Sequence, residues 1–321
     1  MVERFCSALA KHMIHVPVLA HPNSWLQPRR RRLIAGLFVL VLALSLAGCA
    51  PPPNDEPIPP DVLRTIENKG SDTMVNLALA WAETYMDLRP DVRISVTGGG
   101  SGTGIASLIN GTVDIVGASR AIEPVEVEAA EMRGITPVEF TVARDAIAVI
   151  VHPDNPVDDL TFQQLSDIFT GRITNWEELG WERRPIVLVS RESNSGTYMY
   201  FLATVIRMGD EESDLLFSPD ALLMPSSEGI TAEVSQNPNA IGYEGLGYVT
   251  PHEKTVAVAR DAEGPFVLPS QATVVDGTYP IARPLYFYTA GAPTGVIAAY
   301  LDWVIDEGQH IVSELGFVPI Q

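Results

Sequence analysis

The sequence contains almost no cysteine, and both of its cysteines lie near the amino terminus. Cys6 and Cys49 are the only two in 321 residues. The chain after position 49 therefore folds without disulfide bonds and has no thiol chemistry. Its length is sufficient for one large domain or two lobes with separate cores, so small disulfide-stabilised scaffolds are excluded.

Basic residues are also scarce, with 21 Lys and Arg against 40 Asp and Glu and a net charge of −19. Six of the basic residues and only one of the acidic ones lie in the first 48 positions, so the rest of the chain is more acidic still. Nucleic-acid binding needs clustered Lys and Arg and is excluded. An anion would not be attracted from a distance, so any anion site must use short-range, desolvated donors.

Motifs for metal binding, nucleotide binding and hydrolysis are missing. His152, His252 and His310 show no metal-ligand spacing. The glycine-rich stretch at 98–104 is not followed by Gly-Lys-Ser/Thr and holds no G-x-G-x-x-G pattern. Ser101 does not stand in a G-x-S-x-G motif. We therefore expect no enzyme activity, no metal and no cofactor.

The amino-terminal segment has the pattern of an export signal. Arg29–Arg32 precede the apolar run Leu33–Ala47, which has the length of a secretory core and is too short for a membrane span. The run ends in Leu46-Ala47-Gly48-Cys49, which resembles a bacterial lipobox, where the cysteine is acylated. We predict a lipoprotein signal peptide at 1–48 and lipidation, including palmitate, at Cys49, in preference to a short buried helix or a twin-arginine signal.

Beyond Cys49, the proline-rich residues 49–61 are predicted to form an extended tether between a membrane and the folded part. From Val62 onward, strand patterns alternate with helix patterns. This alternation predicts an α/β protein with mainly parallel sheets.

Three segments repeat the order strand, turn, helix, and each turn is rich in Ser, Thr and Gly. In the first, a strand at Arg64–Glu67 leads through Lys69–Asp72 to a helix at Met74–Met86, with Asp72 as the expected N-cap. The other two units have their strand, turn and helix at Val92–Val96, 98–104 and from Ile105, and at Ile186–Val189, Ser190–Thr197 and Tyr198–Ile206.

A helix start exposes unpaired backbone N–H groups and a partial positive charge, and glycine lets a ligand approach them closely. One exposed start contributes only about 0.3–1 kcal/mol to anion binding. Three converging starts, with Ser and Thr hydroxyls and an arginine, would reach the roughly 8 kcal/mol of micromolar binding. The sequence therefore predicts convergence on a small oxyanion, with ordinary capped loops as the alternative.

Six motifs occur in a fixed order: Gly70–Met74, Gly99–Gly104, Gly117–Arg120, Phe169–Trp176, Arg191–Thr197 and Ala240–Tyr243. Together they resemble the phosphate-binding proteins of phosphate ABC transporters, from about residue 62 to the carboxyl terminus. The resemblance implies a two-lobed periplasmic-binding-protein fold, type II-like, with mainly parallel sheets and two inter-lobe crossings. It implies 62–143 with 249–321 as lobe 1, and 144–248 as lobe 2.

By the same resemblance, ligand binding is assigned to residues of all three turns. These residues are Thr73, Met74, Ser101, Arg191, Ser195, Gly196 and Thr197. The implied function is that of an exported monomer, lipid-anchored to the outer face of the cell membrane or in the periplasm. It would capture inorganic phosphate and deliver it to the membrane subunits of an ABC importer. A binding protein for sulfate, molybdate or tungstate, or a phosphate-responsive sensor or adhesin, are the alternatives.

One position departs from the pattern of the family. Well-known members carry an aspartate after Gly-Ala-Ser that accepts the proton of hydrogen phosphate, whereas this chain has Arg120. Such an acceptor separates phosphate from sulfate, which has no proton to donate. Arg120 is expected either to bind the anion as a second cation or to pair with a carboxylate at the lobe edge. Asp72 and Asp145 are the candidate replacement acceptors, with roles as a cap or strand end as alternatives.

Overall fold

The computed structural model describes residues 63–320, so the predictions for the signal peptide, Cys49 and the tether lie outside the described residues. The strands are β1 (Arg64–Gly70), β2 (Val92–Thr97), β3 (Ile115–Ala118), β4 (Val138–Val151), β5 (Asp159–Thr161), β6 (Val187–Arg191), β7 (Leu222–Met224), β8 (Ala240–Gly245), β9 (Lys254–Thr255), β10 (Ala257–Ala259) and β11 (Ala282–Thr289). Between positions 63 and 320, no helix has the length and apolar character needed to cross a membrane.

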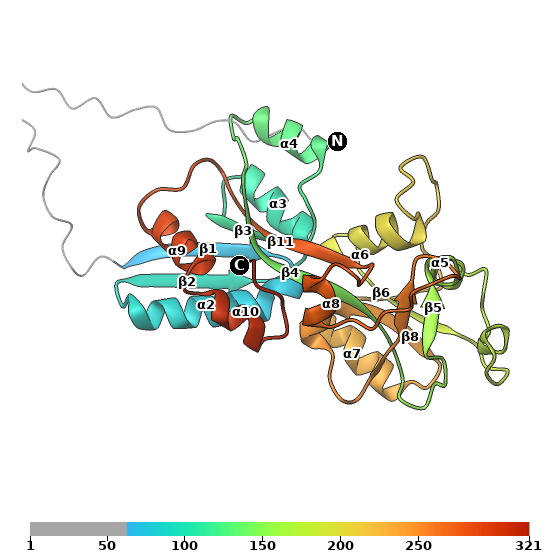
Figure 1. Ribbon diagram of the computed structural model, residues 1–321. Coiled ribbons are helices and arrows are strands. Elements are labelled where there is room, and N and C mark those ends of the chain that lie inside the picture. Colours follow the sequence, from blue (N-terminus) through green and yellow to red (C-terminus); the bar gives the residue numbers. More distant parts are fainter. Residues whose placement is uncertain (1–62, 321) are drawn as a thin grey trace, which may run out of the picture. The chain divides into compact units, whose positions relative to one another are not determined.

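Helices follow most of these strands (Figure 1). They are α2 (Val75–Leu88), α3 (Ser101–Ile109), α4 (Pro124–Glu131), α5 (Phe162–Phe169), α6 (Gly196–Phe201), α7 (Ser227–Gln236), α8 (Gln271–Val275), α9 (Gly295–Ile305) and α10 (Gln309–Glu314). Single 3₁₀ turns are η1 (Asp72–Met74), η2 (Trp176–Leu179) and η4 (Leu246–Tyr248), and η3 (Leu202–Ile206) continues α6 as a π-helix.

The three predicted strand–turn–helix units are confirmed, with local differences; in the third, the strand runs through Arg191 and the helix begins at Gly196 rather than Tyr198. The second helix begins at Ser101 rather than Ile105, because Gly100 adopts a φ of 89° and the chain is helical from the next residue. Asp72 is not an N-cap: it lies inside η1, and its carboxylate accepts hydrogen bonds from Gly99 N and from Arg191. Its side chain joins turns that are distant in the sequence, which local propensity does not register.

The main sheet has the strand order β2-β1-β3-β11-β4-β8-β6-β7, with β9 paired to β4. The outer strands pair in parallel, β1 with β2 and β3 at one side and β6 with β7 and β8 at the other. The two central strands, β4 and β11, are antiparallel to their neighbours. Strand β4 pairs with β11 along its first part and with β8 along its last part, so it runs through both halves of the sheet.

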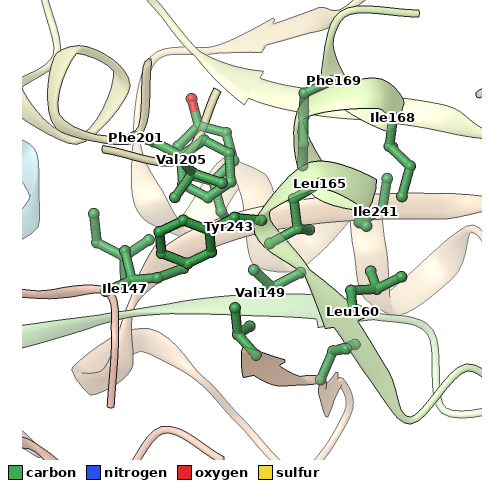
Figure 2. Close-up of a cluster of buried hydrophobic side chains, with 14 of the residues drawn as sticks. Ile147, Val149, Leu160, Leu165, Ile168, Phe169, Phe201, Val205, Ile241 and Tyr243 are labelled. Carbon is green, nitrogen blue, oxygen red and sulfur yellow. The ribbon is translucent and has the colours of Figure 1, made fainter. Parts of the chain in front are cut away.

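Two large hydrophobic cores lie along this sheet, one for each lobe. The first contains Trp81 of α2, Phe287 of β11 and Tyr300 of α9. The second, drawn in Figure 2, contains Phe201 of α6 stacked on Tyr243 of β8, with ring centroids 3.9 Å apart. Large aromatic side chains contribute much of the burial in both cores.

The cores place one segment differently from the expected lobe boundary at Tyr248. Val256, Val258 and Ile281 are buried in the second core. The strands of this segment also pair with that lobe, β9 with β4 and β10 with β5. We therefore propose that residues 254–281 belong to lobe 2 and that the chain returns to lobe 1 at β11.

Glycine lets α3 approach the sheet closely. A Cβ at Gly104 would lie 2.7 Å from both the Cα of Gly70 and the carbonyl oxygen of Lys69. Figure 1 shows α2 and α3 on opposite sides of β1–β3, and Leu108 of α3 packs in a core separate from that of α2. The start of α3 is thereby held against the end of β1.

Candidate functional site

The starts of three helical segments meet where the two lobes touch. Ser71 N donates to Gly117 O at 2.8 Å, which links the first turn to the end of β3. Gly102 N, in the first turn of α3, donates to Asn194 O at 3.0 Å, and Asn194 Nδ2 donates to Gly99 O at 2.9 Å. The three Ser/Thr/Gly turns are therefore in contact, as the sequence predicts.

Five buried hydroxyl groups gather at this meeting point, and we call them the hydroxyl cluster. They belong to Ser71, Thr73, Ser101, Ser119 and Thr197. Thr73 Oγ1 and Thr197 Oγ1 lie 2.7 Å apart across the two lobes. Ser71 Oγ donates to Ser119 Oγ at 2.8 Å, and Ser101 Oγ lies 3.3 Å from the same atom. Hydroxyls both donate and accept, so this cluster is suited to the oxygens of a small anion.

Arg191, at the end of β6, is buried and pairs with Asp72, which stands between Ser71 and Thr73 of the cluster in the chain. Its guanidinium donates to Ser227 Oγ, to the carbonyl oxygens of Met224 and Pro225, and to Asp72 Oδ2 at 3.0 Å. Burial lowers the pKa of Arg191, and the charge of Asp72 opposes that shift. The side chain is thus a buried cation held in one orientation by the second lobe.

Asp72 connects the two lobes through its carboxylate. One oxygen accepts from Gly99 N at 3.0 Å and the other pairs with Arg191, while the side chain keeps 15% of its surface exposed. Tyr248 Oη donates to the backbone carbonyl of Asp72 at 2.8 Å, which fixes the first turn further. Of the two candidate acceptors, Asp72 is the one paired with the predicted ligand-binding arginine.

Asp145 lies in β4 and forms a fully buried ion pair with Arg283 of β11. Its Oδ2 accepts from Arg283 at 2.9 Å, and its Oδ1 accepts from Leu246 N at 3.2 Å. Burial raises the pKa of Asp145, and the charge and hydrogen bonds of Arg283 act against this rise. Asp145 is fully buried within the sheet, whereas the Asp72 side chain keeps part of its surface exposed, so the arrangement favours Asp72 over Asp145 as the acceptor.

Arg120 makes a bidentate pair with Glu126, the N3 residue of α4. Its two terminal nitrogens lie 2.8 and 2.7 Å from the two carboxylate oxygens. Burial by itself lowers the pKa of Arg120, but the hydrogen bond and charge of Glu126 outweigh it and the net shift is upward. This geometry favours the role of a carboxylate partner at the lobe edge over that of an anion ligand.

The remaining predicted ligand residues lie in the turns but are already engaged. Met74 N donates to Ser71 O, and its side chain is buried in the first core. Ser195 is the N-cap of α6, and its hydroxyl accepts from the N–H of Thr197. Gly196 faces the hydroxyl cluster, since a Cβ there would lie 2.4 Å from Ser101 Oγ.

Ser119 and Arg283 were not predicted as site residues. Ser119 directly precedes Arg120 in the Gly117–Arg120 motif, so the sequence motif could have identified it as a site residue. Arg283 is the second residue of the strand Ala282–Thr289. The sequence marks it as a site candidate only because a charged side chain stands in an otherwise largely apolar strand. Across residues 63–320, no group of three His, Cys, Asp or Glu side chains is arranged to hold a metal ion.

Known proteins match most of this chain. Residues 56–307 match the model of the PBP superfamily domain. The phosphate-binding protein PstS of Pseudomonas aeruginosa is 37% identical over 273 residues, covering 79% of this chain and 83% of that protein. This chain belongs to the phosphate-binding protein family. PstS of Bacillus subtilis is 34% identical over 253 residues, covering 78% of this chain and 79% of that protein.

Solved structures of the family share the fold. A proposed phosphate ABC transporter substrate-binding protein from Clostridium perfringens, with bound phosphate, aligns with a TM-score of 0.71 and 32% identity over 80% of this chain and all of that chain. An ABC-type phosphate transport receptor from Vibrio cholerae aligns with a TM-score of 0.63 and 28% identity over 79% of this chain and 99% of that chain. The chain therefore has the two-lobed α/β periplasmic-binding-protein fold, and its family consists of solute-binding proteins for transport rather than enzymes.

Proposed function

We propose that this protein captures inorganic phosphate between its two lobes and delivers it to the membrane subunits of an ABC importer. The observation that carries the proposal is the buried hydroxyl cluster, which draws side chains from both lobes and is linked to the buried Arg191 through Asp72, the residue between Ser71 and Thr73. Charge-assisted hydrogen bonds from an arginine contribute about 1.5–3 kcal/mol each, and helix starts add to them.

Phosphate is favoured over other tetrahedral oxyanions because a carboxylate lies in the site. Asp72 Oδ2 stands 3.0 Å from Arg191, so an anion beside this arginine also meets an acceptor. Hydrogen phosphate has a proton to donate to that acceptor, whereas sulfate, molybdate and tungstate at neutral pH have none.

Isothermal titration of the purified protein with phosphate, sulfate, molybdate and tungstate tests the proposal. We expect micromolar or tighter binding of phosphate, equivalent to about 8 kcal/mol or more. Sulfate should bind at least about a hundredfold more weakly, since a buried acceptor would be left facing an anion that cannot donate. Stronger binding of any of the other three anions would contradict the proposal.

Changing Asp72→Asn tests the acceptor separately. The substitution keeps the size of the side chain but removes its charge, so the repulsion of sulfate should weaken while phosphate still binds. We expect the preference for phosphate over sulfate to narrow by about tenfold, measured by competition titration. Asp87→Asn, at an exposed position of α2, is the control. An unchanged preference in Asp72→Asn would show that another group makes the discrimination.

The ion pair between Arg120 and Glu126 is expected to affect stability rather than phosphate binding. Arg120→Gln and Glu126→Gln each break the same part-buried ion pair, so both should lower the free energy of unfolding by about 1–2 kcal/mol. Neither should change phosphate affinity by more than about threefold, because the pair lies at the edge of the site. Thermal unfolding and titration measure the two quantities. If Arg120→Gln alone weakened phosphate binding, Arg120 would be an anion ligand after all.

We also propose that the protein is exported and anchored by lipid at Cys49, a position outside the described residues. The apolar run ending in Leu46-Ala47-Gly48-Cys49 supports this. Changing Cys49→Ser should release the protein from the membrane fraction, because two lipid chains normally give firm anchoring. Cys6→Ser removes the other thiol upstream and should stay membrane-bound. Continued membrane association of Cys49→Ser would contradict lipidation there.

A further inference from the structure

Arg283, in strand β11, contacts the hydroxyl cluster through Ser119 and Thr197. Its side chain is fully buried, and β11 places it directly opposite Asp145 of β4. The guanidinium donates to Asp145 Oδ2 from Nε and Nη2, to the carbonyl oxygen of Ser119 at 2.9 Å, and to Thr197 Oγ1 at 3.0 Å. It is therefore bonded to residues of both lobes.

The contact with Thr197 fixes the direction of that hydroxyl. An arginine has donors only, so Thr197 Oγ1 must be the acceptor in this bond. The threonine's own proton is then directed elsewhere, and Thr73 Oγ1 lies 2.7 Å away in the other lobe. A threonine held in this way offers a donor on the side that faces the cluster.

The charges around the cluster are arranged as two buried pairs. Arg191 pairs with Asp72, and Arg283 pairs with Asp145. Asp145 offsets the charge of Arg283 through one carboxylate oxygen, while another guanidinium nitrogen of Arg283 is directed to Ser119 O. The sequence offers Arg120 as a second cation for the anion, but in the structure Arg120 is paired with Glu126 of α4.

We propose that Arg283 is the second arginine of the phosphate site, a positioning residue that orients the Thr197 hydroxyl as a donor toward the anion, with Asp145 setting how much of its positive charge reaches the anion. This inference rests on the proposed function, because it names a further residue of the same site. The competing explanation is that Arg283 and Asp145 form a cross-strand pair that only stabilises the sheet.

A double-mutant cycle separates the two explanations. Arg283→Lys, Thr197→Ala and the double variant are titrated with phosphate as purified full-length chains, with Arg207→Lys as control. Arg207 is a half-buried arginine that donates to Leu215 O and has no contact with the cluster. We expect each single change at the site to weaken binding about 10- to 100-fold, and the double variant to lose little more than either single one.

Asp145→Asn gives an independent readout. It keeps an oxygen acceptor for Arg283 but removes the opposing charge, so phosphate should bind a few-fold more tightly even if the protein melts at a lower temperature. A structural pair predicts a lower melting temperature with unchanged or weaker binding, and that result would overturn the inference. So would Arg283→Lys binding like the Arg207→Lys control, or losses that multiply in the double variant.

Three further outcomes also have a defined meaning. If Arg283→Lys does not fold, the Asp145→Asn titration alone decides between the explanations, in the directions stated above. If the unmodified protein does not bind phosphate, the proposed function fails, and the inference fails with it. If the unmodified protein binds phosphate and these variants bind as it does, only the inference fails.

Discussion

Replacing Arg191 with alanine is expected to lower phosphate affinity by about 2–4 kcal/mol, the largest single loss in the site. The guanidinium is buried at the end of β6 and held by four protein acceptors. Its removal leaves a bound anion desolvated without its cation and leaves Asp72 without its partner. Titration with phosphate measures the affinity, and thermal unfolding measures the accompanying loss of stability.

Arg191→Lys distinguishes charge from shape. An ammonium group keeps the charge but cannot reproduce the planar fork that reaches Ser227 and Asp72 together. We therefore expect a substantial loss of affinity here as well. Arg172→Ala, which removes an exposed arginine paired with Asp167, serves as the control and should bind normally. Normal titration curves for both Arg191 variants would exclude this residue from the site.

Changing Gly196→Ala should weaken phosphate binding about 10- to 100-fold, because a methyl group has no room at the start of α6. Its Cβ would lie 2.4 Å from Ser101 Oγ and 2.6 Å from Ser119 Oγ. These hydroxyls must then move apart, and the cluster opens on the side where two lobes meet. The loss should appear mainly in affinity, since serine side chains move at less cost than backbone does.

Gly291→Ala is the matched control for this change. A Cβ at Gly291 has open space around it, and its backbone is not in the left-handed region. Affinity and melting temperature should both stay close to those of the unmodified protein. If Gly196→Ala also left phosphate binding unchanged, the start of α6 would lie outside the anion site.

The sequence can predict those residues of the candidate site that local sequence patterns mark. Thr73, Ser101, Arg191 and Thr197 each lie where a strand passes into a helical segment, and the composition of the connecting turns marks such positions. Their convergence follows from topology, because parallel strands within each lobe end at the same edge, and the β1–β3 group runs opposite to the β6–β8 group, so the two sets of strand ends can face each other. The cluster that the structure brings together is therefore close to the one predicted.

Local sequence patterns do not predict the features of the site that depend on strand order and on contacts between distant residues. Arg283 joins the cluster because β11 lies between β3 and β4, and its contact with Ser119 spans 164 residues. No local pattern specifies that strand order. The choice between the two roles of Arg120, which the sequence leaves open, likewise depends on how α4 directs Glu126. The proposed placement of residues 254–281 in lobe 2 depends on short strands that pair with β4 and β5.

A crystal structure of the protein with phosphate tests the central claim most directly. We predict one phosphate ion between the lobes, within hydrogen-bonding distance of the Thr73, Ser101 and Thr197 hydroxyls and of the Arg191 guanidinium, with one oxygen against Asp72. Phosphate bound elsewhere, or a site between the lobes that stays free of phosphate at saturating concentration, would contradict the account.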